Sequence, residues 1–426
     1  MKWPTIPIGK ACLPTQMRDP SRNPCEAFRY VDISGIDRCL KTVASAPIIM
    51  GSDAPSRARK EVREGDVLVS TVRPNLNAVA LVPPDLDGQI ASTGFCVLRA
   101  NRELIDERYL FYYLTTPDFI GIISGKVRGA HYPAVSDVDV KEVKLPLPPP
   151  SEQRRIVEIL DQADALRKKR AEADAKAARI LPALFYKMFG DPLALVNSGA
   201  VIPLAELDVE LQNGFACGEK DVENGVPHLR MNNVDDAGVL NLDLVRTVPL
   251  DRSVERYRLM ERDVLFMGTN SEDKIGKACL FLPPDDRVYL FSNHLIRLRV
   301  SDARITPEYL AALLHLLWSK RFFPSIAKRW VNQASVAVSA LAALRIPLPA
   351  DKPLREFTAR YQDLRSLRVQ RVRSGHICDK LWAALLHRAF SGDLTAKWRE
   401  ARMKELLAEM EQQAKLLNLP KEALLC

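Results

Sequence analysis

Four loops concentrate the side chains that proteins use to hold nucleic acid. Arg, Lys, Asn and Gln donate hydrogen bonds to the edges of bases, while Lys and Arg also neutralise phosphates. Two loops in the first half of the chain, "TVRPNLN" and "SGKVRGAHYP", carry Arg73, Asn75, Asn77, Lys126, Arg128, His131 and Tyr132. Two loops in the second half, "GTNSEDKIGK" and "AKRWVNQAS", carry Asn270, Ser271, Lys274, Lys277, Lys328, Arg329, Asn332 and Gln333. These residue types favour recognition of a nucleic acid, although any one of them fits an ordinary solvated loop equally well.

Three further groups are weaker candidates. The stretch "RMNNV" offers Arg230, Asn232 and Asn233 as a third cluster of donors. Trp330 has the ring to stack on a base or to wedge into a base step, but a tryptophan that follows a helix is more often packing. Asn293 and His294 stand at the start of the strand pattern "HLIRLRV", where buried polar groups are an equally good interpretation.

Motifs for catalysis are missing from the sequence. It has no Asn-Pro-Pro-aromatic motif to hold a flipped adenine, no G-x-G-x-x-G for a nucleotide and no G-x-x-x-x-G-K-[ST] phosphate loop. The turns "PPDLD" and "PPDDR" are acidic but lack the acid-x-Lys that a metal-dependent nuclease needs, and the six histidines lack the spacing of metal ligands. We therefore expect no catalytic residue, no metal site and no cofactor bound by this chain.

The composition agrees with a nucleic-acid partner in the cytoplasm. A chain of 426 residues is long enough for two or three domains, and its net charge of +8 suits a polyanionic partner. The eight cysteines include no C-x-x-C pair, which favours free thiols in a reducing compartment. The apolar run at 309–318 is too short to span a membrane, and the first residues lack the pattern of a secretory signal.

The sequence is written roughly twice, with a period of about 200 residues. "REGDVLVSTVRPN" resembles "MERDVLFMGTN", and "VKLPLPPP" resembles "LRIPLPAD". Further on, "MFGDP" at 188–192 faces "AFSGDL" at 389–394. Alternation in "DVLVSTV" and "DVLFMGT" predicts strands, while "DERYLFYYL" and "TPEYLAALL" have the spacing of helices. Two copies of one mixed α and β design predict a pseudo-twofold molecule.

A long helix should follow each copy. From Ser151 to about Phe189 the chain has one proline, Pro182, and no glycine, which predicts a single helix with Ser151 as its N-cap. Apolar heptad positions from Ile156 to Leu184, Leu166 among them, predict a coiled-coil seam. The counterpart at about 351–391 should pair with it, since neither helix buries its apolar stripe alone. The tail is predicted to be an amphipathic helix that packs on a partner or on the first half, although a self-packed helix fits as well.

Together these features resemble the specificity subunit of type I restriction-modification enzymes. The resemblance rests on "LPLPPPSEQRRIVEILDQADALRKKR", "LFYKMFGD" and "AFSGDLTAKWRE", and it covers nearly the whole chain. Its specific element is P-L-P-P-x-x-E-Q-x-x-I; the second copy, "PLPADKPLREF", lacks the Glu-Gln pair, so the start of its helix is less certain.

The resemblance implies an α+β fold with two similar mixed α/β target-recognition domains separated by two long antiparallel helices. We accordingly predict recognition domains at 1–148 and 191–349, spacer helices at 149–190 and 350–392, and a tail helix at 393–426. The implied function is non-catalytic reading of a bipartite, asymmetric double-stranded DNA target. The implied partners are two adenine-N6 methyltransferase subunits and motor-nuclease subunits, which would hold S-adenosylmethionine, ATP and Mg²⁺. Two alternatives stay open: a self-contained methyltransferase or nuclease with degenerate motifs, and an assembly scaffold that does not read DNA.

Overall fold

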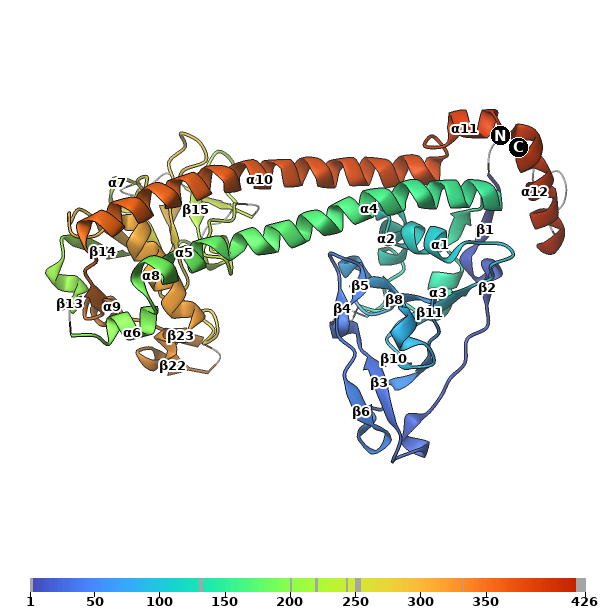
Figure 1. Ribbon diagram of the computed structural model, residues 1–426, viewed down its shortest axis with the longest axis horizontal. Helices are drawn as coiled ribbons and strands as arrows, with labels where there is room; N and C mark the ends of the chain where they lie inside the picture. The colour runs from blue at the N-terminus through green and yellow to red at the C-terminus, as the bar shows by residue number, and fades with distance from the viewer. Residues whose placement is uncertain are drawn as a thin grey trace. The chain divides into compact units, whose positions relative to one another are not determined.

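Two compact units make up the chain. The computed structural model describes residues 3–129, 133–199, 201–218, 221–242, 244–249, 254–331 and 333–418. The first unit combines Met1–Ala171 with Ser374–Cys426, and the second unit is Glu172–Arg373. The chain passes from one unit to the other within α4 (Pro150–Ala178) and again within α10 (Asp351–Ser391), the two long helices of Figure 1.

The first unit contains two four-stranded sheets. One sheet has the antiparallel order β2 (Cys12–Leu13), β11 (Phe95–Ala100), β8 (Val67–Ser70), β9 (Val79–Leu81). The other has the order β6 (Ile48–Met50), β3 (Ala27–Val31), β10 (Ile90–Ser92), β7 (Ala58–Glu61), with β3 and β10 parallel. A separate pair, β1 (Thr5–Pro7) and β12 (Lys144–Pro146), joins the start of this unit to the segment before α4.

The second unit repeats this arrangement, except that, in the part of it that the structure describes, its second sheet has three strands and lacks a counterpart of β7. Its larger sheet has the order β14 (Val209–Asn213), β21 (Leu295–Val300), β17 (Val264–Met267), β19 (Ala278–Leu280). Its second sheet has the order β16 (Arg246–Val248), β15 (Val226–Leu229), β20 (Leu290–Phe291), with β15 and β20 parallel. The pair β13 (Val201–Pro203) and β24 (Arg345–Pro347) corresponds to β1 and β12. The predicted internal repeat and mixed α/β fold are therefore confirmed.

The repeat extends to individual ion pairs. In the first unit Arg99 of β11 donates two hydrogen bonds to the Asp66 carboxylate, at 2.9 and 2.7 Å. In the second unit Arg299 of β21 grips Asp263 in the same way, with both contacts at 2.8 Å. Both carboxylates are buried, so each needs its planar, bidentate arginine to offset the loss of solvation.

Each unit packs one apolar helix on its main sheet. These helices are α1 (Glu107–Leu114) and α8 (Pro307–Ser319), which begin at the side-chain caps Asp106 and Thr306. A buried tyrosine of each donates its hydroxyl to a backbone carbonyl of the pairing strand: Tyr109 to Pro146 at 3.0 Å, and Tyr309 to Pro347 at 3.2 Å.

The other described elements are short. The helices are α2 (Pro117–Ser124), α3 (Asp137–Lys141), α6 (Pro192–Val196), α7 (Val254–Tyr257) and α9 (Val338–Ala342). A hairpin is formed by β4 (Ile36–Asp37) and β5 (Thr42–Val43). The 3-10 turns include η1 (Ile8–Ala11), η2 (Pro20–Arg22), η3 (Ile33–Gly35), η4 (Gly51–Asp53), η6 (Pro84–Leu86), η7 (Leu204–Glu206) and η9 (Phe323–Ser325). Among the described residues, no helix combines the length and the apolar character needed to cross a bilayer.

The helix after the first copy differs from its prediction in two ways. It is interrupted at Arg179, after which α5 (Ile180–Phe189) begins. The cause is Pro182, which has no N–H to donate to the carbonyl of Ala178 and whose ring crowds that carbonyl. Ser151 is not the N-cap either: it lies in the first turn of α4, and its backbone N–H donates to Glu409 at 2.8 Å.

The two long helices run antiparallel within each unit, but the predicted seam is only partly buried. In the first unit Arg170 donates to Ser374 at 2.7 Å, and Arg167 stacks over the Trp382 ring at 4.5 Å. In the second unit Arg371 of α10 donates to the Asp174 carboxylate at 2.8 Å. Leu166, predicted to be a seam residue, is 68% exposed because these polar contacts occupy the interface instead.

A phenylalanine at the end of each long helical segment packs on the core helix of its unit. In the first unit the Phe390 ring of α10 lies 5.2 Å from Tyr109 and 5.3 Å from Tyr113. In the second unit the Phe189 ring of α5 lies 5.0 Å from Tyr309. The sequence match between "MFGDP" and "AFSGDL" therefore marks two equivalent anchoring points.

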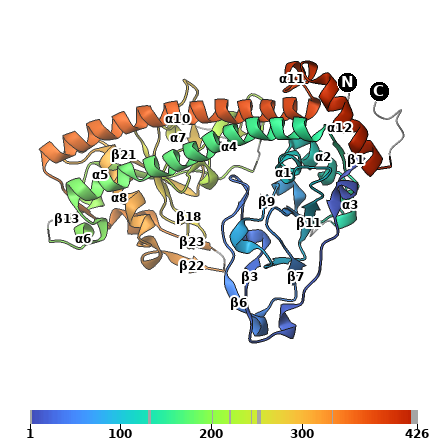
Figure 2. The ribbon, with the colours of Figure 1, turned by 45° about the vertical axis from the view of Figure 1, so that its right-hand side comes forward.

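The tail packs on the first half of the chain. Helices α11 (Ala396–Glu400) and α12 (Met403–Leu416) lie beside the start of α4 (Figures 1 and 2). The Gln413 amide of α12 donates to the carbonyls of Leu104 and Pro148, at 3.0 and 3.2 Å. Of the predicted alternatives, packing on the first half is the one that the structure shows.

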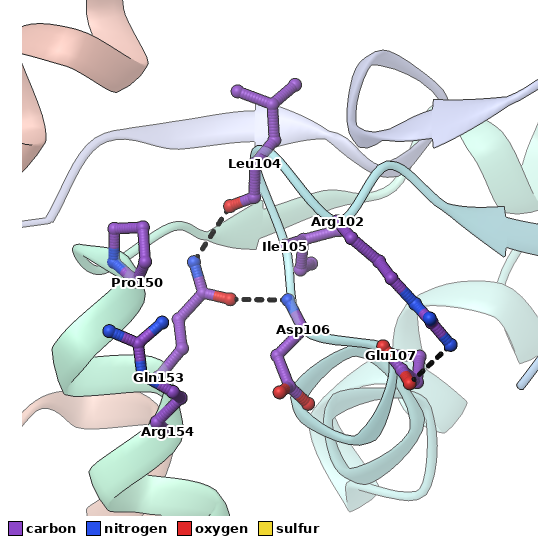
Figure 3. A pocket seen from close by; sticks show the side chains of 8 residues that line it. All are labelled: Arg102, Leu104, Ile105, Asp106, Glu107, Pro150, Gln153 and Arg154. Carbon is purple, nitrogen blue, oxygen red and sulfur yellow. Dashed lines mark hydrogen bonds and ion pairs between the residues drawn. The ribbon is translucent and has the colours of Figure 1, made fainter.

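A small pocket marks the same junction. It has a volume of about 220 Å³ and is open to solvent between the 102–107 loop and the first turn of α4. Figure 3 shows Gln153 crossing from α4 to this loop, where its amide contacts the carbonyl of Leu104 at 2.9 Å and the N–H of Asp106 at 2.8 Å. The side-chain amide of Gln153 thus fixes the start of the helix to the core helix α1.

Candidate nucleic-acid interface

In each unit the two predicted loops meet in a small three-segment sheet. In the first unit Val72 pairs with Ala134, which in turn pairs with Arg128. The backbone N–H of Arg73 adds a bond of 2.8 Å to the carbonyl of Pro133. The sequence separates these loops by about 55 residues, and the strand pairing brings them into one surface.

The second unit builds the same sheet more regularly. Its order is β18 (Thr269–Asn270), β23 (Gln333–Ser335), β22 (Lys328–Trp330), all antiparallel (Figure 2). Thr269 pairs with Ser335 as Val72 pairs with Ala134, so Asn270 occupies the position that Arg73 has in the first unit.

Three residues of the first unit that were predicted to contact nucleic acid face solvent. Arg73, Asn75 and Arg128 are exposed, and the Arg128 side chain is 81% exposed while lying 3.5 Å from Asp139. Arg73 has φ +48 immediately before Pro74 and the turn η5 (Pro74–Leu76). A left-handed backbone is costly for arginine, so the surrounding fold must hold the Arg73 backbone in this conformation, which sets the direction in which its exposed side chain leaves the loop.

Two other predicted residues of the first unit are tied into the fold. Lys126 is half-buried, 3.4 Å from the Asp139 carbonyl and 3.7 Å from the Glu142 carboxylate. Asn77 donates to the carbonyl of Thr115 at 3.1 Å, and its own side-chain oxygen is buried. Asn77, which was predicted to bind DNA, instead supports the turn from inside the fold.

The second unit presents a similar but chemically different set. Lys274, Lys328, Arg329 and Gln333 are exposed. Asn270 and Ser271 are half-buried, and the Asn270 side-chain oxygen accepts from the Ser271 N–H at 2.7 Å. His131, Tyr132 and Asn332 lie outside the described residues.

Lys277 was predicted to bind DNA, but the structure buries its side chain. Its side chain is 5% exposed and is paired with Asp236, and its ammonium lies 5.2 Å from the Trp318 ring. This ion pair lowers the pKa of Asp236, mainly through the hydrogen bond from Lys277. Lys277 directly precedes β19, and its cation takes part in an ion pair within the fold.

The third cluster is mixed. Arg230 is half-buried just before the turn η8 (Met231–Asn233), and Asn232, within that turn, is exposed. Asn233 is buried, accepting from the Arg230 N–H at 2.8 Å and donating to the Asn241 carbonyl at 2.8 Å. Of the uncertain pair near β21, Asn293 is exposed and His294 is half-buried.

Acidic residues at both sheets were missed in the sequence. Asp139 faces Arg128 in the first unit, and Glu272 faces Arg329 in the second at 3.1 Å. A carboxylate beside an exposed guanidinium restrains the direction of the guanidinium. This ion pair must break before the guanidinium can bind a phosphate or a base. The loop sequences "SDVDV" and "NSEDK" contain these acids, so proximity to the basic residues was the available signal.

The chain resembles known proteins in sequence and in fold. A family model described as "Type I restriction modification DNA specificity domain" matches residues 54–174. A putative type I restriction enzyme specificity subunit from Methanocaldococcus jannaschii, MjaX, is 33% identical over 148 residues, which is 34% of each chain. The chain thus spans about a third of the length of that relative.

Two solved structures extend the comparison. An HsdS subunit from Thermoanaerobacter tengcongensis is 31% identical in sequence, covering 92% of this chain and 97% of that chain, with a TM-score of 0.42. A chain from work on complex assembly and conformational transition of the type I R-M system is 29% identical, covering 92% and 98%, with a TM-score of 0.51. With the matched domain, the similarity to MjaX and the duplicated fold, the chain is similar to type I restriction-modification specificity subunits.

Proposed function

We propose that this chain reads a bipartite, asymmetric double-stranded DNA target, one half with each unit. The observation that carries the proposal is the pair of equivalent three-segment sheets with different polar side chains at equivalent positions. Arg73 stands where the second unit has Asn270, and Arg128 stands where it has Lys328. Arginine favours the acceptors of guanine, while asparagine favours the acceptor and donor of adenine, so the two sheets suit different bases.

The proposal assigns methylation and cleavage to partner subunits. Two adenine-N6 methyltransferase subunits would hold S-adenosylmethionine, and motor-nuclease subunits would hold ATP and Mg²⁺. This chain would have no catalytic role. Its contribution would be the placement of those subunits on a chosen sequence, within a complex in the cytoplasm.

Exposed apolar side chains on the long helices support the docking of partners. In the first unit Leu166 of α4 and Ile377 and Leu381 of α10 are 68%, 52% and 63% exposed. In the second unit Leu367 and Val372 of α10 are 58% and 52% exposed. Large apolar residues are rarely left in water over several helical turns unless another protein covers them.

Methylation mapping tests the proposed function. A host that expresses the chain with its methyltransferase partner should carry N6-methyladenine in a motif with two short, different halves and a spacer of fixed length. One continuous motif or a palindrome would contradict reading by two different units. Methylation without any sequence preference would instead support a scaffold that does not read DNA.

A further inference from the structure

The sheet of the second unit projects an aromatic ring that the fold leaves largely uncovered. Trp330 is 60% exposed at the end of β22, and the next residue, Val331, is 91% exposed. Every residue of β22 is exposed, so this strand is a ribbon edge rather than a packed element. The interpretation of Trp330 as a packing residue is therefore excluded.

The strand register places Trp330 among DNA-binding side chain types. Trp330 pairs directly with Gln333, and Lys328 pairs with Ser335. Side chains two residues apart on a strand share a face, and directly paired residues share it too. Lys328, Trp330 and Gln333 thus form the outward face of the ribbon, while Ala334, which is 1% exposed, points to the core. A cation, an aromatic ring and an amide stand side by side.

We propose that Trp330 inserts into the base stack of duplex DNA at one step of the second half-site. The proposal rests on the proposed function, because it requires the second unit to engage DNA. A two-stranded ribbon fits a groove of B-DNA, and an apolar wedge from such an element unstacks one step and kinks the helix. Lys328, on the same face as Trp330, supplies a phosphate contact that holds the ribbon there.

Insertion of Trp330 would make binding depend on how easily the DNA step deforms, in addition to the direct reading of base edges. Pyrimidine–purine steps unstack most easily, so the second half-site should contain one at the insertion point. Val331, beside the ring and almost fully exposed, adds apolar area that DNA would cover. The first unit has Gly129 after Arg128, where the second unit has Arg329 after Lys328, so the two units differ at this place.

The test uses the full chain assembled with its methyltransferase partner and a duplex carrying the mapped target. The reporter is 2-aminopurine, placed in turn at each step of the second half-site except at the methylated adenine, which the methyltransferase itself would flip out, because 2-aminopurine fluorescence rises when the base is unstacked. The wild type should raise the signal at one step, and Trp330→Phe should retain part of the rise. Trp330→Ala should abolish it and weaken binding at least tenfold. Met260→Ala, which removes another exposed apolar side chain of the same unit, is the matched control and should behave as the wild type.

A mismatch at the same step tests whether Trp330 binds DNA by unstacking that step. Unpairing the step in advance should tighten binding by the wild type several-fold but not by Trp330→Ala. Unchanged 2-aminopurine fluorescence with the wild type, or equal binding by Trp330→Ala, would overturn the wedge while the wild type still prefers its target. Loss of assembly with the partner in Trp330→Ala would overturn it as well, because Trp330 would then be a protein contact. A wild-type complex with no preference for the target would contradict the proposed function itself.

Discussion

Arg399 donates to the buried carboxylate of Glu152 at 2.8 Å, which joins the first turn of α4 to the tail across 247 residues of sequence. The same carboxylate accepts from Thr395 at 2.6 Å and from the Trp3 indole at 3.0 Å. Glu152 is fully buried and the Arg399 side chain is 12% exposed. The first unit is therefore closed by a desolvated ion pair between the middle and the end of the chain.

Removing one partner of this pair should destabilise the first unit. Arg399→Met leaves a buried carboxylate without its cation, which costs about 3–5 kcal/mol in the free energy of unfolding. The double variant Glu152→Gln with Arg399→Met should recover much of that loss, since no buried charge remains. Urea unfolding measures both. Arg355→Ala, which breaks an exposed pair with Asp351, should change stability by less than about 1 kcal/mol; an equal loss in both variants would contradict the role of burial.

Phe390 and Phe189, which lie at the ends of the two long helical segments, should each stabilise only their own unit. Phe390→Ala removes ring contacts with Tyr109 and Tyr113, and Phe189→Ala removes those with Tyr309 and Phe357. Each should cost on the order of 3 kcal/mol. Hydrogen exchange should accelerate in α1 only for the first variant and in α8 only for the second. Acceleration of both helices by either variant would show that the anchors are not independent.

Substitution of Lys274 should affect DNA binding, whereas substitution of Lys277 should affect the stability of the fold. Lys274 is exposed, so Lys274→Ala should weaken DNA binding at all sequences and lower the salt slope of log K by about 1. Lys277→Ala should leave the salt slope unchanged but lower the melting temperature, because the packing of the buried Lys277 side chain and its ion pair with Asp236 are lost. Titration of the complex at several salt concentrations checks both. A reduced slope for Lys277→Ala would place that ammonium on DNA after all.

Acid should destabilise the second unit through two histidines. Burial lowers the pKa of His228 and of His315 to about 4, below the usual value of 6.5. Their folded-state pKa values are depressed, so the unfolded chain binds protons first, and stability present above pH 6.5 is lost as the pH falls toward 4. Each histidine should contribute a slope of about 1.4 kcal/mol per pH unit in that window.

Unfolding measured from pH 7 to pH 4 should show this loss in the second unit. His315→Gln should flatten the profile, because glutamine does not titrate. An unchanged slope in that variant would mean that His315 is already protonated in the folded state.

The sequence predicts the duplication well but the orientation of single side chains poorly. Repeated strand and helix patterns are properties of many residues together, and the observed strand orders match them. Lys277 and Asn77 had the right residue types in the right loops, yet both point inward, because type alone does not say which way a loop residue faces.

The helices show the same limit. The heptad pattern placed Leu166 inside, whereas Arg167 and Trp382 occupy the interface through a cation–π contact. The Glu-Gln pair of the first copy is explained only by the fold. Glu152 binds the tail, and Gln153 shares the carbonyls of Leu104 and Pro148 with Gln413. The second copy has Pro353 and Leu354 at those positions, and Leu354 is buried in the apolar core of its unit.

The most direct test of the central claim is methylation mapping of two matched variants. Arg73→Ala removes an exposed guanidinium from the sheet of the first unit, and Arg329→Ala removes one from the sheet of the second. Each complex would be mapped across a whole genome for N6-methyladenine and compared with the wild type. We predict that each variant relaxes or weakens only one half of the motif, a different half in each case, with the spacer unchanged. Loss of the same half in both variants, or no change in either, would contradict the reading of two half-sites by two units.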